Sequence, residues 1–163
     1  LLSHYGVPSV VLERAPALTR HPQAHYINNR TMEVFRALGG SSTHHGQPRQ
    51  TPGVAAGGAG TIAASVRALT PPLPHWRRFV YAESMCGRVM GEVDHFPGAS
   101  EPQDHRHSPE PVAHVPQHRL LPLLLDAARA PGSLTRVLFN HGVQRVKVAP
   151  GGGGVEVEVV EGG

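Results

Sequence analysis

The chain has 163 residues, enough for one domain with a sizeable core, but only 39% are hydrophobic and 5% aromatic. The net charge of +3 is small and the 15 Lys and Arg residues are scattered, which argues against a dedicated nucleic-acid surface. The single Cys86 excludes an internal disulfide and a cysteine-based zinc site, and no apolar stretch reaches the ~18–20 residues that span a membrane.

The first residues predict a chain that begins inside a larger domain. Residues 1–5 are typical of the last turn of a helix with Gly6 at its C-cap, and a domain rarely starts in this way. No Met and no signal peptide are present at the start, so we expect an intracellular protein whose true N-terminus lies upstream. The 19 Gly and 16 Pro residues are concentrated locally, which indicates ordered segments joined by long loops.

An apolar strand is predicted over residues 8–13, and it ends in Glu13. Its near-continuous apolar character is typical of a parallel sheet that is covered on both faces. A helix end, a Gly turn and a strand ending in an acid form the second half of a βαβ unit. In dinucleotide-binding domains such an acid hydrogen-bonds the ribose hydroxyls. The alternative is a solvated residue at the edge of a sheet.

Residues 15–27 are predicted to be loop because of Pro16 and Pro22, and Asn28 or Asn29 is expected to cap a helix that ends near Gly39. The apolar face of this helix predicts core packing for Met32 and Phe35. Residues 40–75 are expected to form a flexible Gly/Pro-rich insertion with at most a short strand or helical turn at 61–69. The glycines at 57–60 do not follow a strand, so they do not predict a phosphate loop.

Residues 76–83 and 89–96 predict a hairpin that turns near Gly87, followed by a loop over 97–116. The 12 histidines show no helical i, i+4 pair with a nearby acid, so no metal site is predicted. A Leu-rich helix is expected after residues 116–119, from Leu120 to Ala130, with Pro122 tolerated only in its first turn. Strands at 136–140, 143–148 and 155–160 follow, the last two as a hairpin at the edge of a β-meander.

Several ordered blocks resemble the FAD-dependent aromatic-ring monooxygenases, the flavoprotein hydroxylases that include phenol and polyketide hydroxylases and have plant and algal members. The blocks are Val11-Leu12-Glu13-Arg14, His21-Pro22-Gln23-Ala24-His25, Ile27-Asn28-Asn29-Arg30-Thr31-Met32-Glu33, Trp76-Arg77-Arg78-Phe79-Val80-Tyr81, Gly91-Glu92-Val93-Asp94-His95-Phe96 and Pro116-Gln117-His118-Arg119-Leu120. Together they cover most of the chain outside the glycine-rich loop, and they are similar to the early part of a family protein.

The resemblance implies an α/β fold: a partial FAD/NAD(P)-binding Rossmann-like domain of the glutathione-reductase type. Residues 1–163 would be an incomplete FAD-binding domain in which 76–115 contribute to the sheet of a β-rich substrate domain. Glu13 would hold the adenosine ribose and Arg14 would lie near the adenine. The loop from Arg20 to Arg30, including Gln23, would pass the pyrophosphate and flavin, and Gln117 and Arg119 would reach the cofactor.

Many bacterial members carry arginines where this chain has Gln23 and His25, and neither residue supplies a charged fork for phosphate. The chemistry implied is NAD(P)H-dependent hydroxylation of an aromatic or polyketide-like molecule on FAD, with no catalytic acid or base from this chain. The family's glycine fingerprint and later FAD segments are not among these residues, so the polypeptide alone is expected to be an inactive fragment. The alternatives are a degenerate, non-catalytic interaction module and an NAD-binding protein that uses Glu13 on its ribose.

Overall fold

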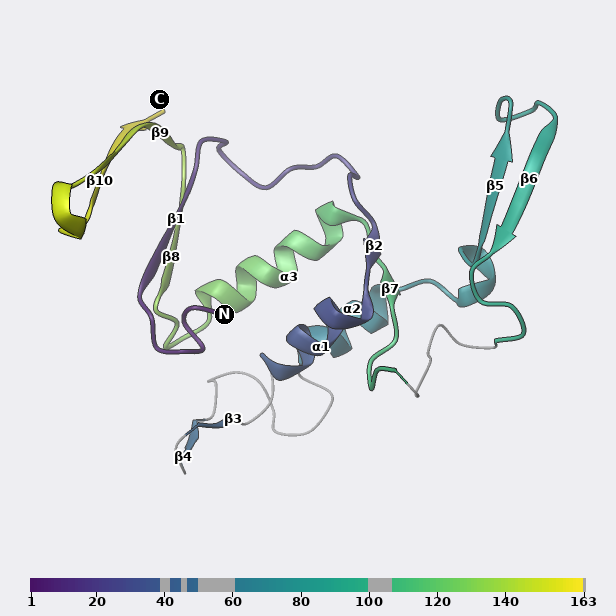
Figure 1. Ribbon diagram of the computed structural model, residues 1–163, viewed down its shortest axis with the longest axis horizontal. Helices are drawn as coiled ribbons and strands as arrows, with labels where there is room; N and C mark the ends of the chain where they lie inside the picture. The colour runs from purple at the N-terminus through teal and green to yellow at the C-terminus, as the bar shows by residue number, and fades with distance from the viewer. Residues whose placement is uncertain (39–41, 45–46, 50–60, 100–106, 163) are drawn as a thin grey trace. The chain divides into compact units, whose positions relative to one another are not determined.

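The computed structural model describes residues 1–38, 42–44, 47–49, 61–99 and 107–162 (Figure 1). The chain divides into two compact units, residues 1–21 with 121–163 and residues 22–120. Helix α3 (Gln117–Arg129) crosses the boundary between these ranges.

The first unit contains a parallel pair of strands, β1 (Ser9–Glu13) and β8 (Thr135–Phe139). The chain enters β1 through a turn in which Val7 N donates to Leu2 O and Gly6 N to Ser3 O. With Gly6 at φ 78°, this is the Schellman arrangement that closes a helix, as the sequence predicts. The strand and its parallel pairing are confirmed. The expected cover on both faces is not found, because Val10 and Val11 remain 54% and 49% exposed.

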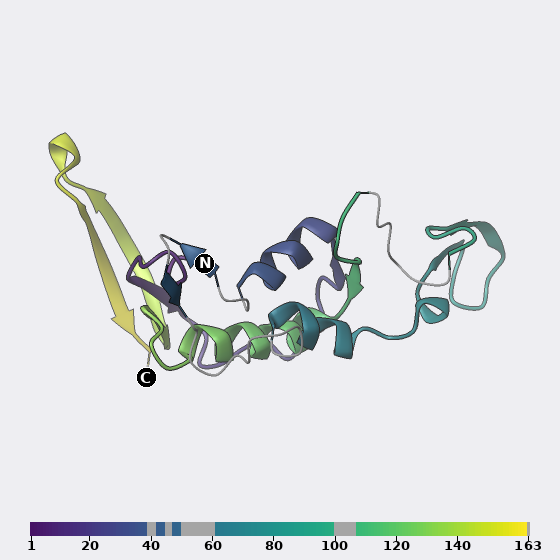
Figure 2. The same ribbon diagram turned by 90° about the horizontal axis from the view of Figure 1, so that it is seen from below.

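The same unit ends in an antiparallel hairpin of β9 (His141–Val148) and β10 (Val155–Glu161), joined by the 3-10 turn η2 (Pro150–Gly152). Figure 2 shows the two strands side by side. Valines pair with valines on one face of the hairpin, and Lys147 lies opposite Glu156 on the other. The alternation in the sequence therefore gives the hairpin one apolar face and one charged face. The predicted hairpin is confirmed; the described residues give this sheet two strands, and β8 pairs with β1 instead.

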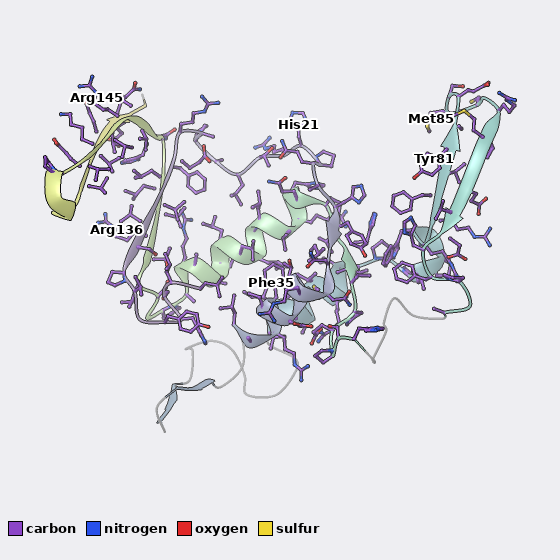
Figure 3. All side chains as sticks on the ribbon, viewed as in Figure 1. His21, Phe35, Tyr81, Met85, Arg136 and Arg145 are labelled. Carbon is purple, nitrogen blue, oxygen red and sulfur yellow. The ribbon has the colours of Figure 1, made fainter. Side chains whose placement is uncertain are left out.

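In the second unit, helix α1 (Asn29–Ala37) packs with helix α2 (Ile62–Leu69). Asn28 caps α1 by accepting a hydrogen bond from Thr31 N at 2.9 Å, as predicted. Met32 and Phe35 are buried, which confirms their core role; Figure 3 labels Phe35. Burying such a side chain contributes about 1.5–3 kcal/mol relative to leaving it in water.

Helix α2 is longer than the short strand or turn that the sequence predicts. Thr61 caps it through a 3.0 Å hydrogen bond from Ala64 N, and Ala63 and Val66 are fully buried. Most of the remaining 40–75 segment lies outside the described residues, apart from β3 (Ser42–His44), β4 (Gln47–Arg49) and the 3-10 turn η1 (Leu73–His75).

A second buried cluster joins Leu73, Trp76 and Val112, with Phe96 packed against it. Trp76 Nε1 donates to Pro71 O at 2.9 Å, so its polar edge is satisfied inside this cluster. Next to it, β5 (Arg78–Ala82) and β6 (Val89–Asp94) form the predicted hairpin; Figure 3 labels Tyr81 and Met85 on it.

Arg77 holds the base of this hairpin. Its guanidinium binds both carboxylate oxygens of Asp94, at 3.0 and 2.8 Å, and the carbonyls of Phe96 and Ala99. The Arg77 hydrogen bonds, with a further one from Phe96 N, lower the pKa of Asp94. The arginine of this sequence block is therefore a structural clamp.

Candidate functional site

The carboxyl end of β1 is held by a short chain of hydrogen bonds. Asn140 N donates to Ala15 O at 3.1 Å, and Ala15 N donates to the Glu13 carboxylate Oε1 at 2.7 Å. Glu13 also stands opposite Phe139 in the parallel register. These contacts fix the direction of the Glu13 side chain. Its other oxygen, Oε2, has no hydrogen-bond partner among the residues that the structure describes.

Asn140 makes the chain reversal between β8 and β9 possible. It has a φ of 61°, the left-handed conformation that Asn tolerates better than most residues, and its carbonyl accepts from Gly162 N at 2.7 Å. The sequence predicted Asn140 as the last residue of a strand. That boundary is wrong by one residue: β8 ends at Phe139 because Asn140 must turn.

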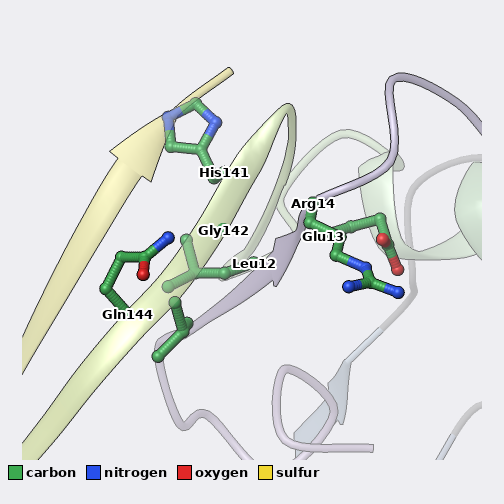
Figure 4. Close-up of a pocket in the computed structure, with 7 residues that line it drawn as sticks. Leu12, Glu13, Arg14, His141, Gly142 and Gln144 are labelled. Atoms are coloured by element: carbon green, nitrogen blue, oxygen red, sulfur yellow. The ribbon is translucent and has the colours of Figure 1, made fainter.

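An open hollow of about 530 Å³ lies at this end of the parallel pair and the start of β9 (Figure 4). It is lined by residues 12–14 and 141–144. Glu13, with its carboxylate, Arg14, with its guanidinium, and Gln144, with its carboxamide, are therefore all lining residues of one surface hollow. This set offers acceptors for hydroxyl groups, a planar cation for stacking and an amide that both donates and accepts.

Two features shape the wall formed by β9. Gly142 lies against Arg14, because a Cβ built on it would be 3.7 Å from the Arg14 Cβ and 3.8 Å from the Val160 carbonyl. The His141 ring is held by a 2.7 Å hydrogen bond between its Nδ1 and Phe139 O. Because a carbonyl only accepts, Nδ1 carries the proton of this bond.

In the second unit, the loop before α1 pairs with the segment before α3. Strands β2 (Tyr26–Ile27) and β7 (Ala113–His114) form an antiparallel pair, in segments that the sequence assigned to loops. Beyond the pair, Val115 N donates to His25 O and Gln117 N to Ala24 O, both at 2.8 Å. The predicted residues Gln23 and Gln117 thus lie on two segments that are hydrogen-bonded to each other.

Arg30 is engaged on its own helix. Its guanidinium pairs with the Glu33 carboxylate at 2.8 Å, and 81% of the Arg30 side chain is exposed. Hydrogen bonds from Arg30 and from the Ser108 hydroxyl lower the pKa of Glu33. The side chain of Arg30 therefore helps to order the surface around α1 in this structure.

Gln23, Gln117 and Arg119 differ from Arg30. Arg119 is the third residue of α3 and is exposed, and its backbone N donates to Pro116 O at 2.9 Å. Within the described ranges, none of the three side chains has a hydrogen bond or an ion pair. They belong to the 22–120 unit, whereas Glu13 and Arg14 belong to the other. The cofactor roles of all six residues remain predictions.

Gly142 and Gln144, which β9 supplies to the hollow, were not predicted from the sequence. One signal was present, since a glycine near the start of a strand often marks a bulge or the close approach of another group. Over the part of the chain that the structure covers, no three His, Cys, Asp or Glu side chains come together as a metal site requires. No helix there has the length and apolar character to cross a membrane.

Comparison with known proteins places this geometry in a family. The family described as FAD binding domain matches residues 1–162. A curated relative, 2,4-dichlorophenol 6-monooxygenase of Delftia acidovorans, is 26% identical over an alignment of 140 residues, and the match covers 83% of this chain and 20% of the relative.

Solved structures agree in fold. The flavin-dependent monooxygenase PieE, in complex with FAD and substrate, has a TM-score of 0.67 at 23% identity, covering 98% of this chain and 24% of its own. RebC with bound 7-carboxy-K252c has a TM-score of 0.68 at 22% identity, covering 98% and 25%. Aklavinone-11 hydroxylase, in a ternary complex with FAD and aklavinone, has a TM-score of 0.60 at 26% identity, covering 97% and 26%.

The chain spans about a fifth to a quarter of the length of these relatives. The α/β fold class and the resemblance to FAD-dependent aromatic and polyketide monooxygenases, both predicted from the sequence, are confirmed. With a match that covers residues 1–162, the chain belongs to the FAD binding domain family, and it is similar to flavin-dependent monooxygenases.

Proposed function

We propose that this chain supplies the adenosine-binding part of the FAD site of an NAD(P)H-dependent aromatic hydroxylase. The observation that carries the proposal is the placement of Glu13 at the carboxyl end of a parallel strand, beside a hollow. In open α/β sheets, ligands bind outside the carboxyl ends of the strands.

The donor and acceptor groups in the hollow fit the adenosine end of FAD. Ribose presents two hydroxyl donors, and the Glu13 carboxylate has one oxygen that no described residue occupies. Because Ala15 N holds the other oxygen at 2.7 Å, the carboxylate is oriented before the ligand arrives. The guanidinium of Arg14, without a partner among the described residues, is available to stack on the adenine.

FAD, when bound, would supply the redox and oxygen chemistry, with NAD(P)H as the reductant. The residues of this chain would bind and orient it: Glu13 and Arg14 at the adenosine, and Gln23, Arg30, Gln117 and Arg119 toward the pyrophosphate and flavin. For Arg30 this requires that its guanidinium leave Glu33, a surface pair that contributes only about 0–1 kcal/mol. An aromatic substrate is proposed from the relatives, one of which is named for 2,4-dichlorophenol.

We further propose that the 163-residue polypeptide by itself holds FAD weakly and does not hydroxylate. A pyrophosphate is bound best by backbone N–H groups at a glycine-rich turn that opens a helix. The sequence contains no Gly-x-Gly-x-x-Gly block that follows a strand and opens a helix. The adenosine contacts of Glu13 and Arg14 would then act without that cradle.

Titration of the isotope-labelled polypeptide with FAD, ADP and FMN, followed by amide chemical shifts, tests this function. FAD and ADP should shift the amides of residues 12–15 and 141–144 in fast exchange, whereas FMN, which lacks adenosine, should leave them unchanged. Glu13→Gln should weaken both effects, and Glu156→Gln, the same change on the exposed face of β10, should not. Absence of any shift with ADP would overturn the adenosine site. Micromolar quenching of flavin fluorescence would overturn the proposal of weak binding.

The hydroxylase part of the proposal needs a complete flavoprotein. A chimera in which this chain replaces the matched 140 residues of the Delftia enzyme should retain FAD and consume NADPH or NADH with a phenol. A chimera that folds, judged by circular dichroism, yet purifies without flavin would favour the alternative of a non-catalytic interaction module.

A further inference from the structure

Strand β9 contains a β-bulge next to the hollow. Arg145 pairs with Glu158 and Val143 pairs with Val159, so Gln144 is an extra residue without a partner on β10. On either side of this point the ladder is regular, with Val146 opposite Val157 and Gly142 opposite Val160. Bulges often lie next to binding sites, where they redirect a side chain.

The bulge residue is exposed and lines the same hollow as Glu13 and Arg14 (Figure 4). Its carboxamide makes no hydrogen bond to the residues that the structure describes. The bulge keeps Val143 opposite Val159, so the valine pairs continue past this point and Gln144 is left as the extra residue of β9. The interruption of the ladder coincides with the one Gln of the hollow.

We propose that Gln144 is a base-contacting residue that selects adenine at the nucleotide end of the cofactor. A carboxamide offers one acceptor and one donor side by side, which match the N6 amino group and the N7 acceptor of adenine. Guanine presents two acceptors, O6 and N7, on the same edge, so one of the two hydrogen bonds is lost. The proposal rests on the proposed adenosine site and adds its base specificity, whereas Glu13 contacts only the ribose that all nucleotides share.

Amide-shift titrations of the 163-residue polypeptide with ADP, GDP and 7-deaza-ADP test the proposal. The wild-type chain should bind ADP about 5- to 10-fold more tightly than GDP, the low end of what a bidentate base contact contributes, because the site is open to water. 7-Deaza-ADP, which lacks the N7 acceptor, should bind more weakly than ADP. Gln144→Ala should weaken ADP to the level of GDP and remove the difference between ADP and 7-deaza-ADP.

Gln144→Glu keeps the size of the side chain but removes the donor and adds a charge, so it should also lose the N7 contact. Val146→Ala, on the same strand and outside the hollow, is the matched control and should keep the ADP preference. Each variant is compared with the wild type by its amide spectrum, so that a misfolded hairpin is recognised.

The two proposals fail in different ways. If Glu13→Gln weakens all three nucleotides but Gln144→Ala keeps the ADP preference, the adenosine site stands and the role of Gln144 is overturned. If Glu13→Gln changes nothing, or no nucleotide shifts residues 12–15 and 141–144, both proposals are overturned. If ADP and GDP bind the wild type equally, the base selection by Gln144 is overturned and the ribose contact is not.

Discussion

Glu110 and Arg67 form an ion pair in which the acid is buried and the base is not: 5% of the Glu110 side chain is exposed, against 40% for Arg67. Arg36 also approaches Glu110, at 3.6 Å from Nε to Oε1, and the Glu110 carbonyl accepts a 2.6 Å hydrogen bond from Asn29 Nδ2. The residue thus connects α1, α2 and the segment before β7.

Replacing Glu110 should destabilise the 22–120 unit. Glu110→Gln keeps the volume but loses the charge, and we expect the free energy of unfolding to fall by about 1–3 kcal/mol, the typical cost of removing one partner of a buried polar contact. The arginines that remain are part exposed and stay hydrated, which places the cost below the ~3–5 kcal/mol of a fully buried pair. Urea unfolding followed by tryptophan fluorescence measures it, because Trp76 is in the same unit.

Glu92→Gln is the matched control for Glu110. Glu92 pairs with Arg78 at 2.9 Å, but the two side chains are 42% and 62% exposed. Such surface pairs contribute about 0–1 kcal/mol, so this variant should unfold close to the wild type. Equal losses for the two variants would contradict the structural role assigned to Glu110.

His114 predicts a dependence of stability on pH. It lies between His25, with ring centroids 4.4 Å apart, and Trp76, at 5.2 Å. Burial lowers the pKa of His114 below 6.5, and the neighbouring His25 lowers it further. Below 6.5 the unfolded chain therefore binds this proton more readily than the folded chain, and stability should fall as the pH drops from 6.5 through the lower folded pKa.

The variant His114→Phe keeps a ring against Trp76 and removes the titrating group. Its melting temperature should fall less than that of the wild type between pH 7.5 and pH 5, and NMR titration of the His114 ring should report the lowered pKa directly. The prediction is wrong if the two proteins lose stability in parallel over this range.

Asn140 supplies the left-handed turn that joins β8 to β9. Asn140→Gly should be neutral or nearly so, whereas Asn140→Val should cost about 1–2 kcal/mol, because a β-branched residue is strained at this φ. A strained turn at residue 140 would also weaken the hydrogen bond from its backbone N to Ala15 O, so the valine variant should bind ADP less tightly at Glu13. Thermal unfolding measures the loss of stability, and the nucleotide titration shows whether the strain at residue 140 also reaches the site at Glu13. Similar stability of the Val and Gly variants would contradict the prediction.

Pro122 is the sixth residue of α3, beyond the first turn where the sequence analysis expected it to be tolerated. That expectation is wrong, because the helix begins at Gln117, where Gln117 N pairs with Ala24 O. Proline lacks the N–H that would bond the His118 carbonyl. Pro122→Ala should therefore stabilise the protein by about 1–3 kcal/mol.

Pro131→Ala, in the turn after α3, is the control for Pro122. A proline whose φ suits its turn stabilises by restricting the unfolded chain, so this variant should gain nothing or lose up to about 1 kcal/mol. Urea unfolding of both variants measures the contrast, and a loss for Pro122→Ala would mean that the residue makes contacts that outweigh the missing hydrogen bond.

Much of the local structure was predictable because it depends on neighbouring residues. The cap of α1 by Asn28, the Schellman turn at Gly6 and the hairpin of β5 and β6 each arise from a short stretch whose pattern is visible in the chain. The length of α2 was not predicted from its Ala- and Ser-rich sequence; in the structure Ala63 and Val66 are fully buried and α2 packs with α1.

By itself, the sequence determined the fold class, the family and the acid at the end of β1, because alternation, helix caps and the blocks that resemble the family each consist of adjacent residues. Only the tertiary structure revealed which distant segments lie beside that acid and beside the other predicted site residues. The backbone bond from Asn140 to Ala15, the bond from Gln117 to Ala24 and the bulge that presents Gln144 all depend on which remote segment lies alongside. Backbone hydrogen bonds between distant segments are made by groups that every residue shares, so they leave almost no trace in the order of side chains.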